Sequence, residues 1–168
     1  TLAVHHGVLT IFDNFAGYRL LDADGNVLDE VHESLARTMK VRAFWLSLEA
    51  PGSPFAPEEE KGVRGLEQLL RVGAPFVIPC DRYDIGSLTN TRFPVTVYLH
   101  ETVPGGIGLA EKLFEVWRTV LRQGMRIAEK CDCRDGCPRC VRANRSDRAG
   151  ERVDKHAALA YAQDTLDF

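Results

Sequence analysis

The sequence lacks any run approaching the roughly 20 consecutive apolar residues that a membrane-spanning helix requires. Its opening stretch, TLAVHHGVLT, does not have the pattern of a secretory signal peptide. Internal repeats and low-complexity segments are missing as well. The chain also begins without a methionine and enters a strand-like run at once, so we expect a fragment of a longer protein. Together these features predict a globular, cytoplasmic protein without a membrane contact.

Two phosphate-binding motifs are also missing: the Gly-x-x-x-x-Gly-Lys-Ser/Thr loop and the full Gly-x-Gly-x-x-Gly pattern. The nearest approach is PGGIGLAEKL, residues 104–113, between a predicted strand and a predicted helix, where free N–H groups can bind an anion. Its glycines equally allow a tight turn with close strand–helix packing, which is the interpretation we favour. Without these motifs the chain is not expected to hydrolyse ATP as a motor by itself.

What is present fits one domain, because 168 residues with 45% hydrophobic and 27% charged side chains are typical of a globular protein. Residues 1–50 are strand-rich, with short β-like runs and a predicted turn at Asp24–Asn26. Residues 51–62 contain three prolines and an acidic run, and we predict a loop there. Residues 63–168 have the pattern of an α/β part.

Within this α/β part we predict a short helix over 63–72, strands at Ala74–Cys80 and Pro94–His100, and a loop between these strands. A long helix follows from residue 109 and a short one closes the chain at 154–166. Apolar residues of the long helix recur every three or four positions and fall on one face: Ala110, Phe114, Trp117, Leu121, Met125 and Ala128. The predicted fold class is α+β, a mostly antiparallel sheet packed by this long helix.

Four of the five cysteines lie within ten residues, spaced C-x-C-x3-C-x2-C: Cys131, Cys133, Cys137 and Cys140. Two disulfides would need strained closures and would leave one cysteine over. Four unrelated buried thiols do not suit a polar, turn-rich segment. We favour a metal site, because four thiolates suit tetrahedral zinc and Gly136 and Pro138 supply a tight turn. An iron–sulfur cluster also takes four thiolates, and the spacing alone does not exclude it.

A site with four sulfur ligands has no open position for a substrate water, so zinc here is expected to be structural. It would fix the zinc loop, residues 131–140, at the end of the long helix. Cys80 lies far away after an apolar run, and we interpret it as a small core residue. Oxidation of the four clustered cysteines as a regulatory switch stays open as a hypothesis.

Positive charge gathers around the zinc loop. Between Arg118 and Arg148 nine basic and four acidic side chains give +5, whereas the rest of the chain carries -8. A zinc ion with four thiolates is formally -2, which reduces the local excess to about +3. Basic residues recur every fourth position from Arg118 to Lys130, so they lie along one ridge of the helix. An ordinary solvated face is the alternative to a phosphate track. The residues predicted to contact phosphates along such a track are Arg122, Arg126, Lys130, Arg134, Arg139 and Arg142.

Acidic residues close to predicted strand ends form a second candidate site. Asp81 and Asp84 follow one predicted strand, and Glu101 follows the other, next to His100. If the strands are neighbours, these side chains would gather into a nuclease-like metal or acid–base site. The alternative, which we favour, is that the aspartates brace the loop by capping its backbone.

Three segments in order, CDRYDIGS, PGGIGLAEKLFE and CDCRDGCPRCV, resemble the MrfA-type zinc-binding domain (MZB) at the C-terminus of a group of superfamily 2 DNA helicases. FAGYRLLDADGNVLDE and AFWLSLE are similar to the leading strands of that family, so the resemblance covers nearly the whole chain, 1–168, as one zinc-binding accessory domain. The chain differs at LHETVPGG, where His100 and Glu101 stand at positions that are usually Tyr-Asp in the family.

The resemblance implies that the four clustered cysteines hold Zn²⁺. It also implies an accessory role beside the ATP-driven 3′–5′ motor domains of the same parent chain, linked to DNA repair. In that setting the domain would guide single-stranded DNA by phosphate contacts and brace the motor. The main alternative is a protein-interaction module that docks on the motor or on a repair partner without touching DNA.

Overall fold

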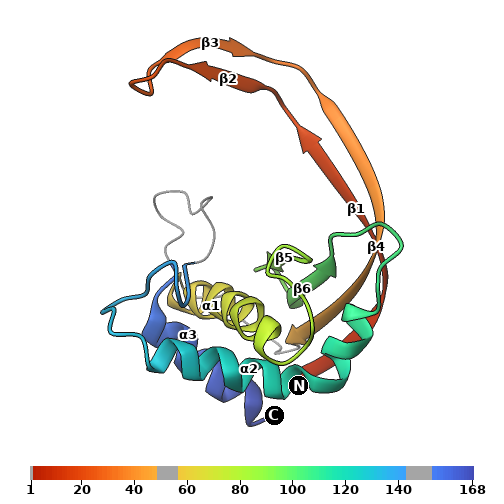
Figure 1. Cartoon of the computed structure of the whole chain (residues 1–168), viewed down its shortest axis with the longest axis vertical. Helices are drawn as coiled ribbons and strands as arrows, with labels where there is room; N and C mark the ends of the chain where they lie inside the picture. The colour runs from red at the N-terminus through yellow and green to blue at the C-terminus, as the bar shows by residue number, and fades with distance from the viewer. Residues whose placement is uncertain (1, 49–56, 143–152) are drawn as a thin grey trace.

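The structure, a computed structural model, describes residues 2–48, 57–142 and 153–168 and has an α+β fold (Figure 1). Four antiparallel strands form one sheet in the order β1-β4-β6-β5, and β2 pairs with β3 in a separate two-stranded sheet. No helix in the described ranges is long and apolar enough to cross a bilayer. The elements are β1 (Leu2–Phe15), β2 (Tyr18–Leu21), β3 (Val27–Val31), β4 (Leu35–Leu48), α1 (Pro57–Gly73), the 3-10 turn η1 (Ala74–Phe76), β5 (Ile85–Asn90), β6 (Val95–Glu101), α2 (Leu109–Glu129) and α3 (Lys155–Leu166).

The core lies between the sheet and the helices. Helix α1 contacts β5 and β6, α2 contacts β1, β4 and β6, and α3 packs on α1 and α2. Cross-strand pairs such as Phe44 with Leu99 and Leu46 with Val97 are fully buried or nearly so, because alternate residues of a strand point to the same side. The predicted α+β class, the strand at β6 and the long helix α2 are therefore confirmed. Of the six predicted apolar residues of α2, five are buried and Phe114 is partly exposed against His6 of β1.

Three predicted elements between residues 51 and 92 differ from the structure. The run Ala74–Cys80 is a 3-10 turn followed by irregular chain, because Pro75 and Pro79 lack the N–H groups that a strand in a sheet needs. The strand lies instead at β5, in the segment that we predicted as a loop. Part of the predicted loop 51–62 is also helical: α1 begins at Pro57, and proline followed by acidic residues is typical of a helix start. Residues 51–56 lie outside the described residues.

Helices α1 and α2 cross so closely that their backbones nearly touch. A Cβ atom added at Gly124 would lie 2.0 Å from the Leu69 carbonyl oxygen, and one at Gly73 would lie 2.2 Å from the Val120 carbonyl oxygen. Each helix therefore needs glycine where it crosses the other, because a side chain at Gly73 or Gly124 would collide with the backbone of the opposite helix. This contact fixes α2, and with it the zinc loop at its end, against α1.

We expect Gly124→Ala to lower the free energy of unfolding by about 1–3 kcal/mol, because the added methyl group overpacks a backbone contact that cannot yield. Urea unfolding of the zinc-loaded protein measures the change. Thr119→Ala is the control, since Thr119 is exposed on the same helix and alanine favours helix there. An unchanged unfolding midpoint for Gly124→Ala would contradict the close crossing.

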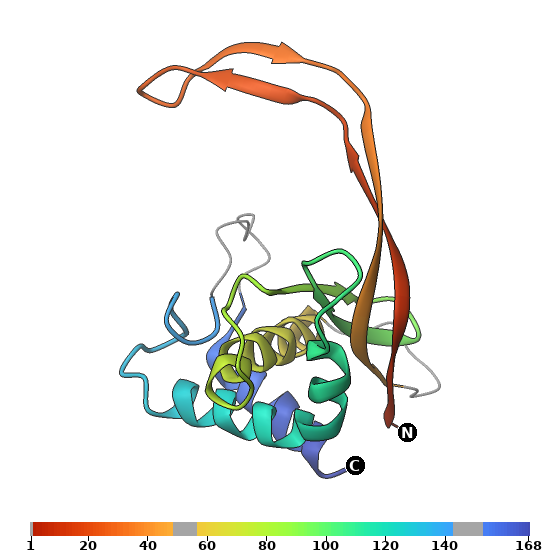
Figure 2. The same ribbon diagram turned by 45° about the vertical axis from the view of Figure 1, so that its right-hand side comes forward.

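The N-terminal strands form an arm that leaves the body of the domain. β1 and β4 pair along all 14 residues, from Leu2 opposite Leu48 to Phe15 opposite Leu35, but β6 joins β4 only over Ala43–Leu48. The remainder rises from the sheet, and the β2–β3 hairpin at its tip bends back over the body (Figures 1 and 2). The predicted turn at Asp24–Asn26 is confirmed there.

Large apolar side chains are exposed along this arm. They are Val8, Phe12, Phe15, Tyr18, Leu20, Leu21, Val27, Leu28 and Leu35. A two-stranded ribbon has no second layer to cover such residues. Sequence patterning did identify the strands but did not predict that they stand apart from the core.

Candidate metal centre

The four clustered cysteines converge on one point at the end of α2. Their Sγ atoms all lie within 4.8 Å of one another, with 3.5 Å between Cys131 and Cys137 and 3.4 Å between Cys133 and Cys140. Disulfide sulfurs are about 2.05 Å apart, whereas tetrahedral zinc with bonds of about 2.3 Å places its sulfurs about 3.8 Å apart. The Cys137 and Cys140 sulfurs are 3.8 Å apart. The donor set therefore fits a tetrahedral metal and not a pair of disulfides.

Local backbone geometry turns the loop around this point. Gly136 has φ 111°, a conformation that favours glycine, and the N–H groups of Cys140 and Arg142 both donate to the Cys137 carbonyl. The Cys137 N–H donates to the Cys140 sulfur at 3.3 Å, as backbone amides do in four-cysteine turns. Cys140 is buried against the core, so the loop is attached to the body as well as to the metal position.

The thiols differ in acidity because their surroundings differ. A hydrogen bond from the Cys133 backbone, aided by the neighbouring thiols, lowers the pKa of Cys131 to about 7. Burial raises the pKa of Cys140 to about 12. At neutral pH without metal, Cys131 is thus partly a thiolate, whereas Cys140 keeps its proton until a metal displaces it. Metal binding releases protons for this reason, and affinity falls as the pH falls.

Lys155, the first residue of α3, supports the zinc loop, and the sequence analysis did not predict this role. Its ammonium group donates to the carbonyls of Cys131 and Cys133, at 3.0 and 2.5 Å, and the residue is only 8% exposed. Its backbone N–H donates to the Asp135 carbonyl. A buried cation beside four thiolates offsets their charge. The signal in the sequence was a lysine directly after the Asp154 cap, where the helix dipole disfavours a cation.

The predicted DNA-contacting residues divide into two groups. Arg142 donates to the carbonyls of Val153 and Asp135, both at 3.2 Å, so its guanidinium holds the zinc loop to the start of α3. Arg134 has an exposed side chain whose nearest carboxylate, on Asp135, is 3.8 Å away. The other predicted residues are also exposed on the end of α2 and on the loop: Arg122, Arg126, Lys130 and Arg139. Contact of this group with DNA stays a prediction.

The basic segment is flanked by acids at one point. Arg122 and Arg126 line a shallow hollow with Glu129 of α2 and Asp167 after α3. Arg145 and Arg148, which contribute to the charge excess of the sequence, lie outside the described residues. The other basic residues run from Lys130 into the zinc loop, where the exposed carboxylates of Asp132 and Asp135 lie among them.

The carboxylates of the candidate acidic site accept hydrogen bonds from backbone N–H groups. β5 and β6 are neighbours, as that hypothesis required, but Glu101 is 1% exposed and accepts from the N–H groups of Ile107 and Ala110 at the start of α2. The Asp84 carboxylate accepts from the Asp81 N–H at 2.7 Å, and the Asp81 carboxylate from the Tyr83 N–H at 3.0 Å. These are the capping and bracing contacts that we favoured.

Within the described ranges, the four clustered cysteines are the one set of His, Cys, Asp and Glu side chains whose ligand atoms come close enough for a metal ion. The glycine-rich segment is a tight turn, with positive φ at Gly105, Gly106 and Gly108. Its N–H groups at the helix start are taken by Glu101, so the protein's own carboxylate occupies the position that an anion would need.

A four-cysteine cluster at the end of a long helix on an α+β body defines a zinc-binding domain. The family model for the MrfA Zn-binding domain, MZB, matches residues 66–141, from α1 to the zinc loop. Residues 66–141 of the chain are therefore similar to the MZB family.

Relatives of the chain include helicases. The chain is 29% identical over 119 residues to the uncharacterized ATP-dependent helicase YprA of Bacillus subtilis, covering 67% of this chain and 15% of that protein. It is 29% identical over 87 residues to the ATP-dependent helicase HRQ1 of Saccharomyces cerevisiae, covering 46% of this chain and 8% of that protein. A protein of Methanocaldococcus jannaschii, MJ1572.1, is 27% identical over 99 residues, which are 55% of this chain and 88% of that protein.

Solved structures extend the similarity of fold to the arm. The structure of the DUF1998 helicase MrfA bound to DNA superimposes with a TM-score of 0.74 at 22% identity, covering 99% of this chain and 22% of that chain. A second structure, of MrfA bound to DNA and AMPPNP, gives a TM-score of 0.66 at 21% identity, covering 100% of this chain and 22% of that chain. The chain spans 15% of its first curated relative and about a fifth of these structures.

We expect Cys133→Ser to abolish stoichiometric zinc, because it removes one of four ligands and leaves an oxygen that zinc accepts poorly in a sulfur site. Cys80→Ser is the matched control, because Cys80 lies outside the cluster. Metal analysis of the purified proteins distinguishes them. Equal zinc content in both variants would contradict the assignment, and iron in the purified wild-type protein would indicate a cluster in place of zinc.

We expect Lys155→Met to weaken zinc binding by about 10–100-fold, the usual effect of losing a group that supports metal ligands. Competition with a chromophoric chelator at fixed pH measures the affinity. Lys112→Met removes an exposed lysine of α2 and should bind zinc like the wild type. Wild-type affinity in Lys155→Met would show that the ammonium group does not support the site.

Proposed function

We propose that this domain is a DNA-contacting accessory module of an ATP-dependent 3′–5′ DNA helicase that acts in DNA repair in the cytoplasm. The observation that carries the proposal is the basic surface on the zinc loop of an MZB domain, whose relatives include ATP-dependent helicases. The chain spans only part of those relatives, so the motor belongs to the remainder of the parent protein.

The zinc is structural in this proposal. Four sulfur ligands close the coordination sphere, so its task is to hold the loop rigid where the loop has little core of its own. A rigid loop holds its basic side chains in place before DNA binds. Binding then costs less conformational entropy, so the contacts to a flexible strand are stronger. Arg134 and Arg139 extend from this loop, and Lys130 lies where α2 ends.

The expected ligand is the sugar–phosphate backbone of single-stranded DNA. Exposed arginine and lysine side chains contact phosphates irrespective of the base sequence. Arg142 contributes indirectly, because its guanidinium is engaged by two backbone carbonyls of the loop. The contacting set is therefore Arg122, Arg126, Lys130, Arg134 and Arg139, positioned by Arg142, Lys155 and the metal.

We expect the zinc-loaded protein to bind a labelled single-stranded oligonucleotide with a log–log salt slope equivalent to about four phosphate contacts, at roughly 0.7 per contact. Lys130→Ala and Arg134→Ala should each lower the slope by about 0.7. Fluorescence anisotropy at several salt concentrations gives these slopes. Lys112→Ala, near the other end of α2, is the control and should keep the wild-type slope.

Unchanged slopes in Lys130→Ala and Arg134→Ala would remove the basic surface from the DNA path. Absence of any binding by the wild type at low salt would overturn direct DNA contact by this domain and favour the second candidate function. Duplex DNA bound more tightly than single strands would contradict the expected strand preference.

The second candidate is a docking module that braces the motor of the parent protein. The exposed apolar side chains of the arm favour it, because a ribbon with Phe12, Phe15 and Leu28 in solvent has surface to bury. The two functions are compatible, since the arm and the zinc loop belong to different parts of the domain (Figure 2).

A further inference from the structure

The described helices pack against one face of the four-stranded sheet (Figure 1). His6 of β1 contacts Phe114 of α2 on that face. The Ser87 hydroxyl of β5 donates to Glu67 of α1 there as well. Because successive side chains of a strand alternate, the residues next to them point to the opposite side, the open face. One row of residues on the open face pairs in register across all four strands: His5, Trp45, Tyr98 and Leu88.

Aromatic rings of the open face lie side by side. The His5 and Trp45 ring centroids are 5.5 Å apart, and the Trp45 and Tyr98 centroids are 6.2 Å apart. A Cβ atom added at Gly86 would lie 2.3 Å from the His100 ring, so the glycine leaves room for a fourth ring. His5 is exposed and the other three rings are half-buried. The strands therefore present a connected aromatic surface.

A cavity of about 600 Å³ lies over this face, between the root of the arm and β5. Its lining includes Leu9–Asp13 of β1 and, from β5 and β6, Leu88, Tyr98 and His100. Its volume is within the range of about 300–1,000 Å³ that is usual for ligand sites. Of the ten described residues that line the cavity, Asp13 is acidic and none is a lysine or an arginine.

Two polar side chains of this lining already have hydrogen-bond partners. The Ser87 hydroxyl donates to Glu67. The Asn90 amide donates to the Pro94 carbonyl at 3.3 Å and accepts from the Arg92 N–H at 3.1 Å. Most of the remaining lining is aliphatic or aromatic. A polar ligand would lose hydrogen bonds to water and regain few here, whereas apolar side chains would gain from burial.

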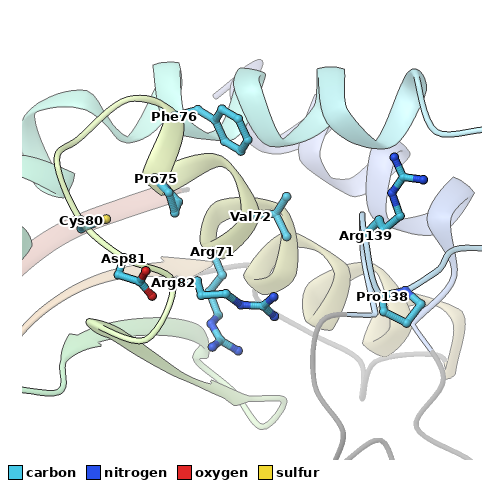
Figure 3. Close-up of a pocket in the computed structure, with 9 residues that line it drawn as sticks. All are labelled: Arg71, Val72, Pro75, Phe76, Cys80, Asp81, Arg82, Pro138 and Arg139. Carbon is cyan, nitrogen blue, oxygen red and sulfur yellow. The ribbon is translucent and has the colours of Figure 1, made fainter.

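A second cavity, of about 480 Å³ beside the end of α1, is charged instead (Figure 3). Its lining includes Arg71, Asp81, Arg82 and Arg139. Arg71 and Arg82 both interact with other groups of the domain, and the Asp81 carboxylate accepts from the Tyr83 N–H. Its charges of both signs are thus engaged within the domain, whereas the open face has apolar surface left to bury.

The composition of the open face is that of the centre of a protein interface. Such centres are enriched in aromatic residues and depleted of charged ones, and tryptophan and tyrosine contribute much of the binding energy. Single-stranded DNA would need basic side chains for its phosphates as well as rings for its bases. The exposed basic residues at the end of α2 and on the zinc loop are not part of this cavity.

We infer that the open face is the docking site for an extended apolar segment of the parent protein, which pairs with the outer edge of β5 and places its side chains in the cavity. β5 is an outer strand of the sheet, and its six residues include neither a charged residue nor a proline. Charges and prolines are the usual means by which an outer strand avoids pairing, and strand addition is a common mode of peptide recognition.

The parent protein has ample chain to supply this segment. The sequence spans 15% of its first curated relative and 22% of the DNA-bound MrfA chain. The inference therefore rests on the proposed parent protein, but it does not require that the zinc loop contacts DNA.

The test introduces a photo-cross-linking residue, Leu88→p-benzoylphenylalanine, into the full-length, zinc-loaded parent protein. Leu88 is 63% exposed, so the replacement leaves the core intact. Irradiation should join position 88 to a segment of the same molecule outside residues 1–168, which mass spectrometry of the digested monomer identifies. Thr119→p-benzoylphenylalanine, at an exposed position of α2, is the control and should not join to that segment.

Each other product overturns the inference. A cross-link within residues 1–168 would show that the domain covers its own open face, and a cross-linked dimer would show that a second copy does so. A cross-link to an added 15-mer of deoxythymidine would show a nucleic-acid surface. No cross-link from position 88 would show that the face stays uncovered.

Hydrogen exchange measures the strand addition itself. In the full-length protein, Leu88→Lys should make the β5 amides exchange about tenfold faster or more, because a charge in the apolar contact releases the added strand. Val8→Lys is the matched control, since Val8 is also 63% exposed but lies outside the cavity. Wild-type exchange of β5 in Leu88→Lys would overturn the inference.

These outcomes are separate from those of the proposed DNA contact. Lys130 and Arg134 do not line the cavity, so wild-type salt slopes in their alanine variants would overturn DNA contact and leave the docking site intact. Lower slopes in those variants, without a cross-link from position 88, would overturn the docking site alone. A parent protein that cross-links from position 88 but has no helicase motor would support the docking site and overturn the proposed motor.

Discussion

The meeting of four thiols at one point is the constraint on which this end of the molecule depends. The loop from Cys131 to Arg142 joins two helices and buries few side chains, so a hydrophobic core cannot define its shape. The sulfur cluster replaces that core, and hydrogen bonds from Lys155 and Arg142 tie the loop to the start of α3. With the loop fixed, Arg139 becomes one wall of the cavity beside α1.

The body supports this arrangement through backbone proximity. Gly73 and Gly124 let α1 and α2 approach until only glycine fits between them, and Gly65 does the same where α1 meets Ala158 of α3. Three helices held at such short range leave little freedom for the end of α2, from which the zinc loop departs. The helix crossing therefore fixes the position from which the zinc loop departs.

Local patterns in the sequence predicted the strands of the arm, α2, α3 and the cluster of four cysteines, because spacing and periodicity report directly on such features. They failed where contacts are distant in sequence. The apolar run after α1 looks like a strand until its two prolines are weighed, and the polar β5 is a strand because Ser87 and Thr89 donate to the buried Glu67. Lys155 gave only the signal of a lysine directly after a helix cap, because the carbonyls that its ammonium group binds lie 22 and 24 residues away.

The arm has a mechanical consequence. β4 pairs with β6 only over Ala43–Leu48, Arg42 forms an ion pair with Glu111 of α2 and Val41 is buried, so six residues of β4, Leu35–Lys40, extend beyond the body. At about 3.4 Å per residue this free part is roughly 20 Å long, so a 10° tilt at its root displaces its far end by roughly 4 Å. A small rotation of the sheet therefore moves the tip of the arm much further than its root. Conversely, a force on the tip exerts a torque on β4, the strand whose residues Phe44 and Leu46 are buried in the core.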